Sequence, residues 1–112
     1  MSQVTTHILD TTKGKPAAGV TIIIYEGGND EWNELSRGVT NDDGRLPTLL
    51  DKETILQQGI YKLRFETKDY FDRSQTKTFY PYVEIVFEIS STEHYHVPLL
   101  LNPFGYSTYR GS

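Results

Sequence analysis

Short runs that alternate apolar and polar residues dominate this chain, and they leave room for little except a β-sheet fold. Tyr61–Phe65 places Tyr, Leu and Phe on one side of an extended segment and Lys and Arg on the other, and Val83–Ile89 shows the same alternation. Successive side chains of a strand point to opposite faces, so each run predicts a strand with one buried and one wet face. Turn residues separate these runs at intervals typical of a β-sandwich. We therefore predict an all-β fold.

Further strands are expected elsewhere in the chain, together with one helix. Val20–Tyr25 is apolar on nearly both faces, which is typical of a strand in the middle of a sheet. The other expected strands are Val4–Leu9, a run around Trp32–Thr40, and His94–Leu101. The one expected helix covers Lys52–Gln58, about two turns, with Asp51 as its cap and Gly59 as its stop.

Two loops carry strong turn chemistry. The Asp10–Pro16 loop contains a Gly-Lys-Pro sequence that ends the first strand. Asp42-Asp43-Gly44 is a tight-turn signal, and we expect it to deliver Arg45 onto the next strand. On this evidence alone Arg45 is a solvated hairpin residue.

Length and composition set outer limits on organisation and partners. With 112 residues we expect one domain, residues 1–112. The apolar fraction of 37% is low while aromatics reach 12%, so we expect an oligomer that covers aromatic surface. A net charge of −4 supplies no basic stripe for nucleic acid. The absence of cysteine excludes disulfides, thiolate nucleophiles and sulfur-bound metals.

Targeting signals are not evident in the sequence. The first six residues have no positive region and no signal-length apolar run, so we expect a cytoplasmic protein. No stretch approaches the roughly 20 apolar residues that span a bilayer, and no membrane partner is expected.

The histidines are the first candidates for chemistry. His94 and His96 share one face of a regular strand, and His7 lies on the first strand. A lone histidine on a strand is most often a hydrogen-bonded structural residue, yet a pKa of about 6.5 also suits it to move protons near neutral pH. Zinc bound by the three histidines is an alternative, although no carboxylate or cysteine follows at a ligand spacing.

The last four residues, Tyr109-Arg110-Gly111-Ser112, concentrate a phenol, a guanidinium and a hydroxyl. For an arbitrary protein such a segment is a surface tail. No Gly-x-Ser-x-Gly elbow and no phosphate-binding loop is found, so a serine hydrolase and a nucleotide site are unsupported.

These residues carry a family resemblance. His96–Ser107 resembles the C-terminal signature of the transthyretin superfamily, and His7–Asp10 with Gly14–Ala17 resembles its N-terminal signature. Asn102 departs from the serine usual in the family, at a position that supports a turn. The resemblance implies a two-sheet transthyretin-like sandwich with one short helix, assembled as a homotetramer, a dimer of dimers with pockets between the dimers.

The superfamily contains a hormone carrier and the 5-hydroxyisourate hydrolases. Where the carrier has lysine, glutamate and threonine, this chain has His7, Arg45 and His96, which resemble the hydrolases. The final Tyr-Arg-Gly-Ser is also similar to the hydrolase ending. The resemblance therefore implies hydrolysis of 5-hydroxyisourate to 2-oxo-4-hydroxy-4-carboxy-5-ureidoimidazoline, on the way from urate to allantoin.

The resemblance also implies roles for these residues. The two histidines would activate water, and Arg45 would hold the substrate and its developing oxyanion. Tyr109, Arg110, Gly111 and Ser112 would line the pocket, with the Ser112 hydroxyl and carboxylate orienting water, substrate or a histidine. No metal and no cofactor is expected. The alternatives are a carrier of a small aromatic ligand in a central channel and a purely structural sandwich.

Overall fold

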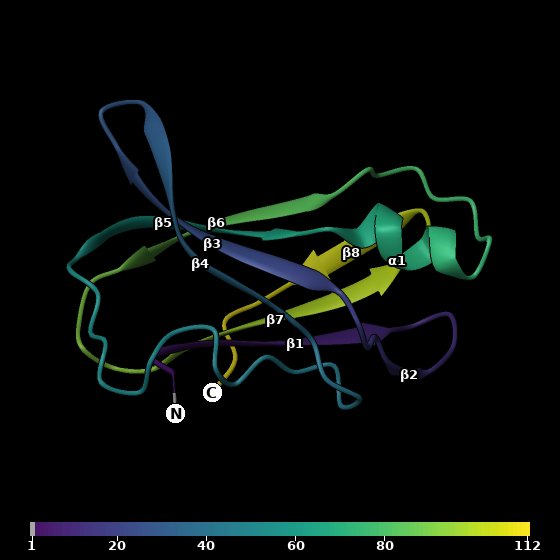
Figure 1. Cartoon of the computed structure of the whole chain (residues 1–112), viewed down its shortest axis with the longest axis horizontal. Coiled ribbons are helices and arrows are strands. Elements are labelled where there is room, and N and C mark those ends of the chain that lie inside the picture. The colour runs from purple at the N-terminus through teal and green to yellow at the C-terminus, as the bar shows by residue number, and fades with distance from the viewer. Residues whose placement is uncertain (1) are drawn as a thin grey trace.

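Two four-stranded sheets form the two layers of the computed structural model, which describes residues 2–112 (Figure 1). Met1, the first residue of the expected 1–112 domain, lies outside the described residues. One sheet has the strand order β2-β1-β7-β8 and the other has the order β4-β3-β5-β6. The elements are β1 (Val4–Asp10), β2 (Lys15–Pro16), β3 (Thr21–Gly28), β4 (Glu31–Val39), β5 (Gly59–Phe65), α1 (Thr67–Arg73), β6 (Val83–Ile89), β7 (Tyr95–Asn102) and β8 (Gly105–Thr108).

The core is one cluster of apolar side chains contributed by both sheets. Ile8 and Leu99 come from the first sheet, Ile24 and Leu63 come from the second, and all four are fully buried. Burial of each such aliphatic side chain contributes about 1.5–3 kcal/mol relative to exposure. In β5, Tyr61, Leu63 and Phe65 are buried in the core as predicted, but the opposite face is not wet throughout, because Lys62 is buried against the rings of Tyr25 and Trp32. The apolar run of β3 lies inside its sheet between β4 and β5, as predicted.

The first and the seventh strands lie side by side and parallel, although about ninety residues separate them in the sequence (Figure 1). The register pairs Val4 with Tyr95 and runs without interruption to Asp10 with Leu101. Strands β7 and β8 form an antiparallel hairpin closed by residues 103 and 104. Neither β8 nor the short β2 was expected from the sequence.

The expected helix at Lys52–Gln58, capped by Asp51, is wrong. That segment is irregular, with a single turn in which the Thr54 N–H donates to the Asp51 carbonyl at 3.0 Å. A helix of this length is marginal by itself. Here the Leu56 N–H donates to the Gln3 side chain at 2.8 Å, a tertiary contact that ties the segment to the residue before β1.

The short helix of the fold is α1, which follows β5 directly. Its Phe71 is buried in the core, and Thr67 is buried as well. The sequence 67–73 lacks the apolar repeat of a longer helix, so its helical character depends on the packing of Phe71. This seven-residue helix is too short to cross a membrane, and no other helix occurs in residues 2–112.

Candidate functional site

The parallel pairing of β1 and β7 sets the positions of the predicted histidines. Thr5 lies opposite His96 in the register, and His7 lies opposite Pro98. Side chains two positions apart on a strand share a face, so Thr5 and His7 point to the same side of the sheet. Both are half-buried, as is His96. The sheet thus presents two histidines on one face beside each other.

Arg45 reaches this face from a tight turn rather than from a strand, contrary to the expectation. Arg45 forms an isolated antiparallel bridge with His7, and the Ile8 N–H donates to the Gly44 carbonyl at 2.9 Å. Gly44 has φ +71°, and a Cβ there would lie 2.5 Å from the Ile8 carbonyl oxygen, so only glycine fits. The Asn41 side chain accepts from the Arg45 N–H at 3.1 Å and shapes the turn. The Arg45 backbone is thereby fixed beside His7, and its side chain lines the cavity described next.

A cavity of about 260 Å³ lies over these residues, and we call it the histidine cavity. It is lined by Thr5, Thr6, Arg45, Pro47, His94, His96 and Ser112. Its lining combines imidazoles, a guanidinium and hydroxyls. The cavity therefore offers a base, a cation and polar groups to one small polar molecule. His7 lies next to it, joined to Arg45 through their bridge.

The surroundings keep both predicted histidines neutral. Burial, and then the positive charge of Arg45, lower the pKa of His96, and His94 and His7 add to this effect. Burial and Arg45 also lower the pKa of His7, against a hydrogen bond to the Asp43 backbone that raises it. Since the ordinary pKa of histidine is about 6.5, both rings are uncharged at neutral pH and can accept a proton.

Thr5 connects two of the histidines, and sequence reasoning missed it. Its Oγ1 lies 2.7 Å from His94 Nε2 and 2.8 Å from His96 Nδ1. The rings of His94 and His96 are stacked, with centroids 6.2 Å apart, which confirms that they share a face. The signal that could have identified Thr5 is its spacing of two from His7 on one strand.

The chain after β8 returns to this site. The Gly111 N–H donates to the His96 carbonyl at 2.8 Å, in an isolated bridge that resumes the pairing of β8 with β7. A Cβ at Gly111 would lie 2.5 Å from His96 Cδ2, so the backbone lies directly against the imidazole. Ser112 lines the histidine cavity. The tail is therefore part of the wall around His96.

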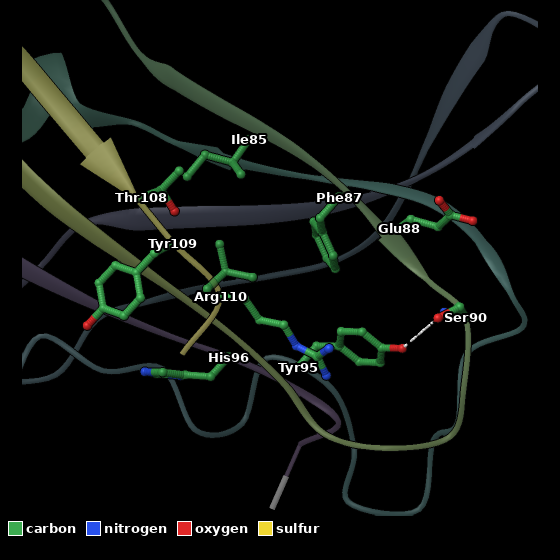
Figure 2. A pocket seen from close by; sticks show the side chains of 10 residues that line it. Ile85, Phe87, Glu88, Ser90, Tyr95, His96, Thr108, Tyr109 and Arg110 are labelled. Carbon is green, nitrogen blue, oxygen red and sulfur yellow. Dashed lines mark hydrogen bonds between the residues drawn. The ribbon is translucent and has the colours of Figure 1, made fainter. Parts of the chain in front are cut away.

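Tyr109 and Arg110 face a second, larger cavity of about 380 Å³ that shares His96 with the first (Figure 2). Figure 2 shows the long Arg110 side chain extending to the Tyr95 ring, with the guanidinium carbon 4.4 Å from its centroid. Arg110 also pairs with Glu93 at 2.8 Å. Because its charge already has a partner, this geometry favours an anchoring role for Arg110. Apolar side chains of Ile85 and Phe87 line much of the rest.

The zinc alternative gains no support from the geometry of the three histidines. Within residues 2–112, no group of three His, Asp or Glu side chains is arranged to hold a metal ion. One ring nitrogen of His94 and one of His96 bond to the Thr5 hydroxyl instead.

Comparison with known proteins identifies relatives of this chain. The sequence model described as "HIUase/Transthyretin family" matches residues 4–111. The 5-hydroxyisourate hydrolase of Mus musculus is 47% identical, over 99% of this chain and 96% of the mouse protein. That of Halalkalibacterium halodurans is 48% identical, over 98% of each.

Solved structures agree in fold. The 5-hydroxyisourate hydrolase of Klebsiella pneumoniae has a TM-score of 0.86 at 38% identity, covering 97% of this chain and 98% of that one. Sea bream transthyretin in complex with thyroxine has a TM-score of 0.91 at 30% identity, covering 98% and 95%. The resemblance seen in the sequence is confirmed, and the chain belongs to the HIUase/Transthyretin family.

Proposed function

We propose that this protein hydrolyses 5-hydroxyisourate to 2-oxo-4-hydroxy-4-carboxy-5-ureidoimidazoline. Relatives that carry the hydrolase name are 46–48% identical over nearly the full chain, and they support this assignment. The observation that carries it is the convergence of a neutral His96 and the cation of Arg45 on one small polar cavity, with His7 bridged to Arg45. These are the groups that addition of water to a cyclic amide requires.

In the mechanism we propose, His96 acts as a general base. Its Nδ1 is held by Thr5, which leaves Nε2 as the nitrogen that can take a proton from water. The water oxygen bonds to the ring carbon, and Arg45 stabilises the oxyanion that develops there. The carbon–nitrogen bond then breaks, and the departing nitrogen receives the proton from the imidazolium. His7 is placed to orient the water or to share this transfer, because it adjoins both Arg45 and the cavity.

The tail residues complete the pocket in this proposal. Ser112 contacts the substrate or its water, Gly111 fixes the His96 ring from one side, and Tyr109 forms a wall of the adjoining cavity. Arg110 holds the tail in place through Glu93 and Tyr95, and so shapes the substrate pocket from outside.

We further propose a homotetramer, a dimer of dimers. Its support is the exposure of large apolar side chains: Phe79 is 71% exposed, Phe104 63%, Tyr109 59% and Val86 57%. Such side chains are commonly covered where subunits meet. Light scattering should give about four times the 12.8 kDa subunit mass, whereas a monomer at micromolar concentration would contradict this proposal. A cytoplasmic location stays a prediction, to be checked with a fluorescent fusion.

The carrier alternative is less well supported. The fold is common to the thyroxine-bound sea bream transthyretin and to the Klebsiella hydrolase, so fold similarity does not separate them. The imidazoles and the guanidinium in the lining of the histidine cavity do separate them, because these groups are poor partners for an aromatic ligand without matching polar groups.

The decisive experiment follows freshly generated 5-hydroxyisourate by ultraviolet absorbance with and without the protein. We expect rapid catalysed decay, and a loss of about a hundredfold or more in His96→Ala as the base is removed. Circular dichroism should show that this variant stays folded. Decay at the uncatalysed rate with the folded wild-type protein would overturn the proposed function.

A further inference from the structure

One hydroxyl group stands between two imidazoles in this structure. Thr5 Oγ1 lies within hydrogen-bond distance of both His94 Nε2 and His96 Nδ1, at 2.7 and 2.8 Å. A threonine hydroxyl has one proton to donate and two lone pairs that accept. It can therefore donate to only one of the two rings, and it accepts from the other. The protonation patterns of His94 and His96 are coupled through this group.

Two protonation patterns are compatible with both hydrogen bonds of the Thr5 hydroxyl. If Thr5 donates to His96 Nδ1, a neutral His96 carries its proton on Nε2 and presents no lone pair to the cavity. If Thr5 donates to His94 Nε2, it accepts from a protonated His96 Nδ1, and His96 Nε2 is free. The second pattern is the one that can take a proton from water.

The role of His96 as a general base requires the second pattern, because only there does Nε2 carry a free lone pair. The ring nitrogen that faces Thr5 is Nδ1. A proton on Nδ1 leaves the Thr5 hydroxyl proton for His94, whose Nε2 then accepts it.

We propose that His94 is a positioning residue, which acts through the Thr5 hydroxyl to hold His96 in the tautomer with Nδ1 protonated and Nε2 free. His94 itself is exposed and needs no contact with substrate for this role. The consequence for catalysis rests on the function proposed above. The coupling between the two rings does not, because it is a property of the protein without substrate.

The direct test is a ¹⁵N NMR spectrum of the full chain, since nitrogen shifts and couplings distinguish the two tautomers of an imidazole. We expect wild-type His96 to carry its proton on Nδ1. Thr5→Val removes the hydroxyl at nearly constant shape, and His94→Phe removes the acceptor but keeps a flat ring. Both should shift His96 toward a mixture of tautomers. Thr5→Ser keeps the hydroxyl and should restore the wild-type tautomer.

Kinetics provide a second readout. Loss of the group that fixes the tautomer of a catalytic histidine costs about 10⁴-fold in serine proteases. Here both tautomers stay accessible in the variants, so we expect a smaller fall in kcat, about tenfold to hundredfold, with KM nearly unchanged. Thr92→Val, at an exposed threonine two residues from His94, is the matched control and should behave as wild type.

The outcomes separate the two proposals. If His96 carries its proton on Nε2 in the wild type, or if its spectrum is the same in Thr5→Val and His94→Phe, the positioning role is overturned. If the tautomer responds as expected but the wild-type protein does not turn over 5-hydroxyisourate, the coupling stands and the proposed function fails.

Discussion

Gly111→Ala should disable the site while leaving the fold intact. The new Cβ would lie 2.5 Å from His96 Cδ2, 3.2 Å from Pro98 Cγ and 3.3 Å from His96 Cγ. Carbon atoms pack at about 3.5–4.0 Å, so the imidazole and the tail must separate by about 1 Å. The backbone of Gly111 is not in the left-handed region, so alanine itself introduces no conformational strain there.

Both partners of this contact are held. The His96 ring is bonded to Thr5 at 2.8 Å, and the Gly111 N–H is bonded to the His96 carbonyl at the same distance. Relief of the contact therefore breaks the alignment of the ring or detaches the tail. A displacement of about 1 Å in a catalytic group can lower a rate by about a hundredfold. We expect a loss of that size in kcat/KM.

The assay is the absorbance decay of 5-hydroxyisourate, together with a thermal melt. Gly28→Ala is the matched control, because a Cβ at Gly28 meets nothing within 4 Å and the residue lies in β3, outside the histidine cavity. It should keep wild-type kcat/KM. If Gly111→Ala, folded and melting normally, also retained kcat/KM within about threefold, the close approach of tail and imidazole would have no catalytic meaning.

Four further predictions concern other residues and conditions. Arg45→Met removes a charge that lowers the pKa of His7 and His96, so proton NMR titration should show both pKa values rising toward 6.5. Unchanged pKa values would contradict the effect assigned to the Arg45 charge. Because these folded-state pKa values lie below the unfolded value, the unfolded chain binds more protons, and urea titrations should show stability falling as pH drops below about 6.5. Tyr70→Phe removes a 2.8 Å hydrogen bond to the buried Asp10 carboxylate and should lower the unfolding free energy by about 1–2 kcal/mol. An unchanged unfolding free energy would refute a structural role for that bond. Activity should survive a chelator, and loss that zinc reverses would restore the metal alternative.

The sequence predicts the strands well because their evidence is local. Alternation in β5 and β6 and the apolar run of β3 each place residues on a face without knowledge of the rest of the chain. The helix was placed wrongly because Lys52–Gln58 has helical composition, whereas in the structure the Leu56 N–H donates to the side chain of Gln3, 53 residues away. Such a contact leaves no trace in a local pattern.

The same difference between local patterns and long-range contacts applies to the functional site. Histidine chemistry was evident from residue type, and the resemblance to a family identified which histidines matter. That Thr5 joins two rings depends on the parallel register of β1 and β7, which the chain's own periodicity does not contain. The contact of Arg45 with His7 depends on a turn that crosses to β1 at Gly44. Both are products of tertiary structure.

The parallel pairing of β1 with β7 also has a consequence for how the protein matures. Contacts between Thr5 and His96 join segments that are about ninety residues apart, so a nascent chain lacks the site until residues 95–102 have been synthesised. Closing such a long loop lowers the entropy of the chain before any stabilising contact forms, and this slows folding. Until then β1 exposes an unpaired edge to other chains. Refolding should therefore be slow and concentration-sensitive, and activity should return only with the last folding phase.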